Sequence, residues 1–227
     1  MRSNKASEGT LQGYVILREK LSSSIPDSLP YEQACVFPLC LYMKDFLALS
    51  HPSVKTAKGS TGKYLIVWSG STSLGSNDIH VAVASGYTII PTASPQNFDY
   101  VARLGAAHVF DYRSPSTLPD IIVLLKDKQH AGALAIGDGS MQACIDIISS
   151  APGREFISQA SLPMPKVIPP KGMTLVSFIA GFVWFKLNTF AKCSVKGVGY
   201  KFIEGNDLIA NEVGKAIYEV VIPEICR

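Results

Sequence analysis

From Lys63 onward, short apolar runs rich in β-branched residues alternate with stretches that have a helical spacing of apolar positions. The short runs predict buried strands, and the stretches between them predict helices. This alternation is typical of parallel strands joined by crossover helices. The predicted strands are Tyr64–Trp68, Thr88–Thr92, His108–Tyr112, Gly132–Ile136, Glu155–Ala160 and Thr174–Ile179, and the predicted helices are Ser76–Ser85, Asn97–Leu104, Leu118–Lys126, Met141–Ser149 and Asp207–Val221.

The predicted fold class is therefore α/β, a Rossmann-type doubly wound parallel sheet of about six strands. Two segments do not follow the alternation. In Met1–Thr61, the pattern predicts only a strand at Gly13–Leu17 and a short helix from Tyr31. Leu162–Gly172 is rich in proline and is predicted to be an extended surface loop.

Composition places the chain among globular proteins, with 47% hydrophobic and 17% charged residues. The net charge of +3 is small and the basic residues are scattered, so a nucleic-acid partner is not expected. Met1–Thr10 lacks the apolar core of a secretory signal, which favours a cytoplasmic location. The apolar run Leu175–Phe185 is shorter than the roughly 20 residues of a membrane span, and we expect it to be a buried strand plus loop.

The cysteines and histidines do not predict a metal site. The 5 cysteines have no paired ligand spacing, and an odd number of them argues against a disulfide framework. The 4 histidines lie far apart, without a cysteine or carboxylate at ligand spacing. We expect free thiols with structural roles, and no bound metal.

The strongest chemical signal is the segment VWSGSTSLGS, Val67–Ser76, at the junction of the first predicted strand and helix. Small residues let the backbone approach a pyrophosphate, and the start of a helix offers amide groups and a positive dipole end to the phosphates. With glycines only at Gly70 and Gly75, the segment is not a GxGxxG motif, and an ordinary loop between strand and helix would account for it in isolation. Within a repeating strand–helix array it predicts a dinucleotide site.

The end of the second predicted strand indicates which dinucleotide is bound. An acid there would hold the ribose 2′-hydroxyl of NAD, but this segment reads TASPQNFDY and offers the uncharged Ser94 and Asn97. NADPH is therefore favoured over NADH. Because no arginine or lysine clamp follows this strand, the alternative that Ser94-Pro95 only turns the chain stays open.

Four segments together resemble fungal zinc-independent medium-chain dehydrogenase/reductases, the group of trans-acting enoyl reductases and quinone-oxidoreductase-like enzymes. They are SIPDSLPYEQACVFPL (Ser24–Leu39), LIVWSGSTSLGSNDIHVAVASGY (Leu65–Tyr87), TASPQNFDYVARLGAAHVFDY (Thr92–Tyr112) and NEVGKAIYEVVIPE (Asn211–Glu224).

The resemblance implies where NADPH would bind. The family's pyrophosphate contacts correspond to Gly70, Ser71, Thr72, Ser73 and Leu74. Its contacts to the 2′-phosphate end correspond to Ser94, Asn97 and Tyr112, and Ile136 would lie along the cofactor. Two positions depart from the family. Gln96 stands where a basic residue is common, and Leu134-Ala135-Ile136-Gly137 lacks the usual aspartate.

The resemblance also implies a domain organisation. Residues 1–40 would be a tail and a remnant of the family's GroES-like catalytic domain, and residues 41–227 the dinucleotide-binding domain, so that the chain looks truncated. Bulky side chains at Tyr42, Lys44 and Asp45 stand where small residues near the nicotinamide are usual. They are the candidate catalytic residues if they line a new pocket, and the alternative is drift on an exposed helix.

Three functions follow as hypotheses. The first is NADPH-dependent reduction of an activated alkene or quinone, a small-molecule substrate, in fungal secondary metabolism. The second is a non-redox cyclase or isomerase recruited from the truncated scaffold. The third is an inactive NADPH-binding module or a partner of a larger biosynthetic synthase. By analogy with the family, a homodimer would form through the edge strand predicted at Thr174–Ile179.

Overall fold

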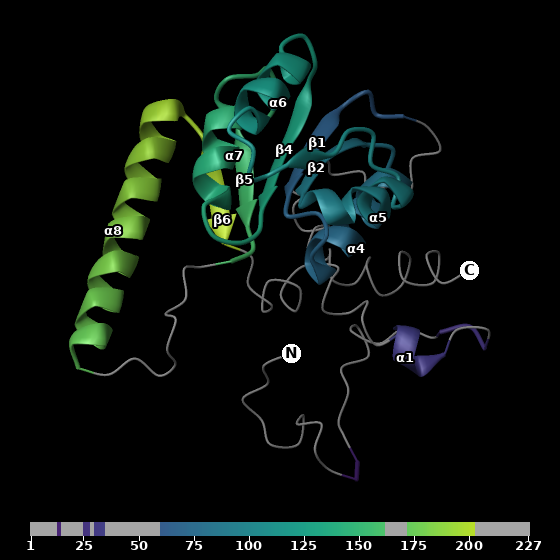
Figure 1. Ribbon diagram of the computed structural model, residues 1–227, viewed down its shortest axis with the longest axis horizontal. Coiled ribbons are helices and arrows are strands. Elements are labelled where there is room, and N and C mark those ends of the chain that lie inside the picture. The colour runs from purple at the N-terminus through teal and green to yellow at the C-terminus, as the bar shows by residue number, and fades with distance from the viewer. Residues whose placement is uncertain (1–12, 15–24, 28–29, 35–59, 162–171, 203–227) are drawn as a thin grey trace. The chain divides into compact units, whose positions relative to one another are not determined.

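A computed structural model describes residues 13–14, 25–27, 30–34, 60–161 and 172–202 (Figure 1). The chain divides into two compact units, Thr56–Phe202 and a second made of Met1–Lys55 with Ile203–Arg227. In the second unit, a short helix α1 spans Tyr31–Ala34, as expected from the sequence. The predicted helix at Asp207–Val221 and most of the Leu162–Gly172 loop lie outside the described residues.

The Thr56–Phe202 unit is built on one six-stranded sheet with the order β3-β2-β1-β4-β5-β6, and every neighbouring pair is parallel. The order reverses between β1 and β4, which is the arrangement of a doubly wound Rossmann fold. The strands are β1 (Tyr64–Trp68), β2 (Thr88–Ala93), β3 (Phe110–Asp111), β4 (His130–Ala135), β5 (Phe156–Gln159) and β6 (Gly199–Phe202).

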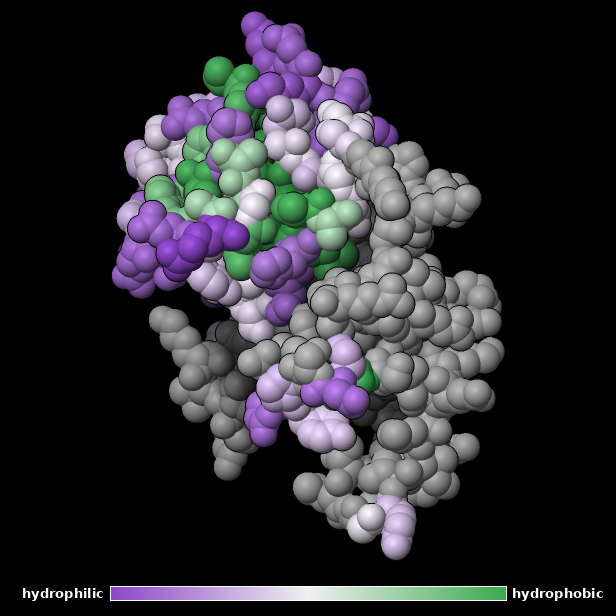
Figure 2. Space-filling model, turned by 90° about the vertical axis from the view of Figure 1, so that its right-hand side faces the viewer, coloured by the Kyte–Doolittle hydropathy of each residue, from purple (hydrophilic) through white to green (hydrophobic). Residues whose placement is uncertain are grey.

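The helices follow the strands in alternation and cover both faces of the sheet. They are α4 (Ser73–Ala84), the 3₁₀ helix η3 (Pro95–Asn97) with α5 (Phe98–Arg103), α6 (Thr117–Leu125), α7 (Ser140–Ile148) and α8 (Met173–Lys196). Helix α4 packs on β1 and β2, while α7 packs on β4, β5 and β1. Seen from the side that carries α5, the described surface has a central apolar area bordered by hydrophilic residues (Figure 2).

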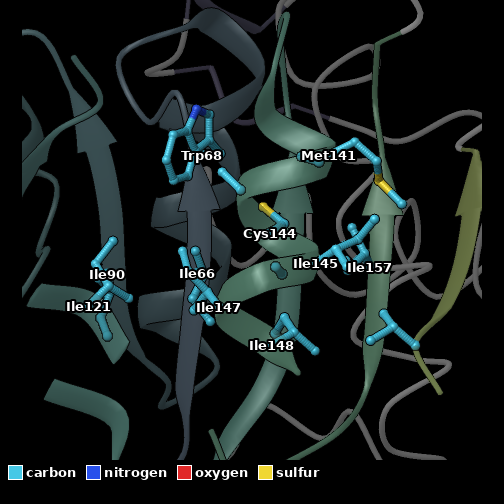
Figure 3. Packing of buried hydrophobic residues seen from close by; sticks show 14 of the residues in the cluster. Ile66, Trp68, Ile90, Ile121, Met141, Cys144, Ile145, Ile147, Ile148 and Ile157 are labelled. Carbon is cyan, nitrogen blue, oxygen red and sulfur yellow. The ribbon is translucent and has the colours of Figure 1, made fainter. Parts of the chain in front are cut away.

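The strands β1, β2, β4 and β5 are buried on both faces, which explains why they read as continuous apolar runs rather than as alternating ones. Ile66 and Trp68 of β1 lie in one core with Cys144 and Ile147 of α7 (Figure 3). Leu65 and Val67 of β1 are also buried, and because side chains alternate along a strand they point to the opposite face. The predicted fold class is confirmed, and five of the predicted strands overlap the observed β1 to β5.

The last predicted strand is wrong. Thr174–Ile179 is the start of α8, a helix of 24 residues that ends at Gly197, whose φ of 68° forms a left-handed C-cap. Between Gly172 and Gly197 there is no proline and a single glycine, Gly181, so a helix can continue through this interval. The strand prediction relied on a β-branched run that a helix accommodates equally well.

The sixth strand is instead β6, which pairs with β5 in the register Phe156↔Gly199 to Gln159↔Phe202. Among the described strands, β3 and β6 are therefore the sheet edges. The expectation that Thr174–Ile179 supplies an edge strand to a homodimer is wrong for the same reason. The prediction of a buried strand at Leu175–Phe185 is also wrong, because most of that part of α8 is exposed.

Candidate dinucleotide site

The turn between β1 and α4 begins with an unusual backbone conformation at Ser69, whose φ is +68° although it is not a glycine. Three hydrogen bonds hold it there: Ser69 N donates to Thr92 Oγ1 at 3.0 Å, Ser69 Oγ donates to the Ile136 carbonyl at 3.0 Å, and Gly70 N donates to the Thr92 carbonyl at 2.7 Å. Strained residues that are held in this way cluster at binding sites. The turn is thus tied to β2 on one side and to the end of β4 on the other.

The two glycines of the turn are required by close approach rather than by positive φ. A Cβ on Gly70 would lie 2.7 Å from Pro91 Cβ and 2.9 Å from Ile79 Cδ1. A Cβ on Gly75 would lie 2.5 Å from the Ser69 carbonyl oxygen. Both glycines are buried and their missing side chains would point into the protein, so the turn packs directly against β2 and α4.

Thr72 caps α4. Its Oγ1 accepts a hydrogen bond from Gly75 N at 3.1 Å and donates one to the Ser69 carbonyl at 2.8 Å. Thr72 and Ser73 are exposed, and Ser71 and Leu74 are partly exposed, so the turn presents its outer side to solvent. The first turn of a helix carries amide groups without helical partners and the positive dipole end, which suits an anion.

The end of β2 carries the buried Ser94, to whose Oγ the Asn97 side-chain amide donates at 3.1 Å. Ser94 precedes η3, and Gln96 is exposed on it. The three residues of η3 include no acid, and the next acid along the chain is Asp99 in the first turn of α5.

The strand register brings Tyr112 beside Ser94. Ala93 of β2 pairs with Asp111 of β3, so the residues that follow them leave the sheet side by side. Arg113 comes next, with its Nε donating to the Tyr112 hydroxyl at 3.2 Å and its guanidinium lying 5.1 Å from the Tyr112 ring centre. Arg113 is thus a cation that follows the neighbouring strand β3.

Sequence reasoning missed Arg113 because it looked for a cationic clamp only after β2. The signal was present, since arginine directly follows the tyrosine that the family resemblance assigned to the 2′-phosphate end. Arg113 and Tyr112 are both exposed, as a contact residue for a bound ligand would be before it binds.

The predicted cofactor residues lie at one edge of the sheet. Ile136 follows β4, its side chain is 9% exposed, and its carbonyl is the acceptor for Ser69 Oγ. The turn after β1 and the ends of β2, β3 and β4 thus converge at the carboxyl edge, beside the switch in strand order. This is where open α/β sheets bind ligands. The predicted residues gathered there are Gly70, Ser71, Thr72, Ser73, Leu74, Ser94, Asn97, Tyr112 and Ile136.

The candidate catalytic residues Tyr42, Lys44 and Asp45 lie outside the described residues, so their role stays a prediction. Within the part of the chain that the structure describes, no group of His, Cys, Asp and Glu side chains is placed to hold a metal ion.

Comparison with known proteins finds sequence relatives and similar structures, although no family model matches the chain. The chain is 41% identical over 234 residues to the dehydrogenase pigH of Monascus ruber, a match that covers 99% of this chain and 62% of that protein. It is 39% identical over 127 residues to the trans-enoyl reductase himH of Aspergillus japonicus, covering 55% of this chain and 37% of that protein.

The described fold matches the quinone oxidoreductase of Thermus thermophilus, whose crystal structures include a complex with NADPH. The TM-score is 0.55 at 15% identity, over 85% of this chain and 53% of that one. The chain therefore spans little more than half the length of the proteins it matches. In sequence the chain matches fungal dehydrogenases and trans-enoyl reductases, and its fold is that of the nucleotide-binding domain of quinone oxidoreductases in the medium-chain dehydrogenase/reductase family.

Proposed function

We propose that the Thr56–Phe202 unit binds NADPH, with the pyrophosphate on the Ser69–Ser76 turn and the 2′-phosphate between Ser94 and Arg113. The observation that carries this proposal is the exposed start of α4, Thr72 and Ser73, which lies at the carboxyl edge of the sheet beside the switch in strand order. Amide groups without helical partners and the positive end of the helix dipole suit a diphosphate at such a position.

Selection of NADPH over NADH rests on charge. Ser94 and Asn97 offer uncharged hydrogen-bonding groups at the end of β2, where an acid would favour NADH. Arg113 offers a guanidinium that can make paired hydrogen bonds to a phosphate, and Tyr112 holds its Nε at 3.2 Å. Gln96 contributes no charge, so Arg113 is the cation assigned to this end of the cofactor.

The chemistry that NADPH supplies when bound is hydride transfer, and we assign as acceptor an activated alkene or a quinone, which takes up the hydride and a proton. The chain's own residues position the cofactor: Thr72 fixes the start of α4, and Ser69 ties the turn to the Ile136 carbonyl at the end of β4. The trans-enoyl reductase among the relatives supports the alkene class of substrate. A cytoplasmic location and a synthase partner stay predictions.

Titration calorimetry with NADPH and NADH tests the cofactor assignment. Loss of one charged hydrogen bond costs about 1.5–3 kcal/mol, so Arg113→Gln should weaken NADPH binding about 10- to 100-fold and leave NADH binding unchanged. The matched control is Arg103→Gln, an exposed arginine in the last turn of α5, which should change neither affinity.

Ser94→Asp tests the other side of the same subsite. It places a negative charge against the 2′-phosphate and should lower the preference for NADPH over NADH. If the unmodified protein binds neither dinucleotide, or if Arg113→Gln weakens both equally, the proposal is wrong. Consumption of NADPH with enones and quinones, followed by absorbance, then tests the reductase assignment separately.

A further inference from the structure

Ser69 occupies a position where the backbone itself favours glycine. Among the described residues other than glycine, Ser69 alone has a positive φ, at +68°. Glycine adopts this conformation without cost, whereas a residue with a side chain is strained in it. The chain therefore carries a strained residue whose side chain makes a contact that glycine could not make.

That contact crosses the switch in strand order. Strand β1 pairs with β4 up to Trp68 and Ala135, and both chains then leave the sheet. One residue further along each chain, Ser69 Oγ donates to the Ile136 carbonyl at 3.0 Å. The hydroxyl thus adds one hydrogen bond beyond the end of the strand ladder, at the carboxyl edge of the sheet.

Ser69 is itself fixed on both sides of this bond. On the β2 side, Ser69 N donates to Thr92 Oγ1 at 3.0 Å, and Thr92 is fully buried. On the β4 side, Gly137 follows Ile136, and its amide donates to Ser161 Oγ just after β5. A Cβ on Gly137 would lie 3.7 Å from Ser69 Oγ, so this loop lies against the serine. Ser69 therefore connects the ends of β2 and β4 and, through Gly137, the end of β5.

The two sides that Ser69 connects correspond to the two halves of a dinucleotide. In a doubly wound sheet, each half of the sheet takes one mononucleotide, and the ligand crosses the crevice where the strand order reverses. The half with β1, β2 and β3 carries Ser94 and Arg113, which the proposed function assigns to the 2′-phosphate. The other half begins at β4 with Ile136. A hydrogen bond between the halves links the geometry of one to that of the other.

We propose that Ser69 is a positioning residue whose hydroxyl couples the two halves of the dinucleotide site. It holds the loop after β4 in a fixed place relative to the pyrophosphate turn, so that both halves of NADPH find their contacts at once. This inference rests on the proposed function and gives Ser69 no contact with the reacting atoms. Its consequence is a margin of affinity: NADPH should bind more tightly than adenosine 2′,5′-bisphosphate, which fills only the half with Ser94 and Arg113, and part of that margin depends on the hydroxyl.

Two substitutions separate the hydroxyl from the strain. Ser69→Gly removes the hydroxyl and relieves the strain, whereas Ser69→Ala removes the hydroxyl and keeps the strain. Thermal unfolding should therefore rank Ser69→Gly above Ser69→Ala. Binding should not follow that order. NADPH should bind about 2- to 10-fold more weakly to both variants, which corresponds to the loss of one hydrogen bond, while adenosine 2′,5′-bisphosphate should bind as tightly as to the wild type.

Titration calorimetry of the full chain measures both affinities. The fluorescence of bound NADPH is a second readout, because the emission of the dihydronicotinamide ring depends on its surroundings, and it should shift toward that of free NADPH in both variants. Ser85→Ala is the matched control. It removes a serine hydroxyl that donates to the Val81 carbonyl at 2.7 Å, at the other end of α4, and should change neither the affinities nor the emission.

The outcomes separate this inference from the proposed function. If the wild type binds neither ligand, the proposed function fails and the coupling fails with it. If the wild type binds both and Ser69→Gly keeps the full margin between them, only the coupling is wrong. Equal losses for both ligands, or a loss confined to Ser69→Ala, would also overturn the coupling, because Ser69 would then only shape the turn.

Discussion

Replacement of Gly75 by alanine separates two effects that act in opposite directions on the same residue. Gly75 lies in the first turn of α4 and has no positive φ, so its backbone would accept any residue. Helix propensity alone predicts that alanine stabilises the protein by about 1 kcal/mol. The added Cβ, however, would lie 2.5 Å from the Ser69 carbonyl oxygen and 2.9 Å from Gly70 Cα.

Both of these neighbours are backbone atoms, so they yield only if the turn shifts. Overpacking costs about 1–3 kcal/mol, and because backbone atoms have to move here we take the upper part of that range, about 2–3 kcal/mol. After subtraction of the propensity gain, we expect Gly75→Ala to lower the free energy of unfolding by about 1–2 kcal/mol, or the melting temperature by roughly 2–8 °C for a chain of this length. The shifted turn should also weaken NADPH binding.

Gly181→Ala is the matched control. Gly181 also lies in a helix without a positive φ, but a Cβ there would meet no atom within 4 Å, so only propensity acts and the protein should become more stable. Thermal unfolding followed by circular dichroism measures both variants. If Gly75→Ala melts at or above the wild-type temperature, the turn is not packed as described.

Three further predictions concern individual residues. Thr72→Ala removes the cap of α4 and should lower the free energy of unfolding, measured with urea, by about 1 kcal/mol. Thr72→Ser should keep most of that stability, because serine can cap the helix in the same way. His130 is buried and burial lowers its pKa from 6.5, so the unfolded chain binds the proton more readily. Stability should therefore fall as the pH drops below about 6.5, and the fall between pH 7.5 and 5.5 should be smaller in His130→Gln; an equal fall would contradict this. Burial raises the pKa of the Cys144 thiol far above neutrality, so iodoacetamide should label Cys144 only after unfolding, as read by peptide mass spectrometry.

The elements nearest the candidate site could be predicted because their signals are local. Tyr64–Trp68 matches β1 at both ends, and the small residues from Ser69 to Ser76 mark a turn that no buried strand could continue through. Gly75 and Thr72 also have local causes, since a tight turn and a helix cap are each decided within a few residues. The predicted phosphate turn follows from these short-range preferences.

Helix α8 and strand β6 could not be predicted in the same way. An apolar run with β-branched residues suits a strand or a helix, and only the 24-residue interval between two glycines and the pairing of Gly199–Phe202 with β5 decide between them. β6 has four residues of alternating exposure and no strong apolar pattern of its own. Its identity as a strand depends on its partner.

The sequence by itself determined the fold class, the position of the phosphate turn and the absence of an acid after β2, because each depends on residues close together in the chain. Only the tertiary structure decided that Ser69, 67 residues away from Ile136, donates to its carbonyl, and that Ala93 at the end of β2 pairs with Asp111 at the end of β3. It also decided that Thr174–Ile179 belongs to a long and mostly exposed helix. Such contacts depend on strand order, register and relative length, which are properties of the packed sheet and have no signal in any single segment.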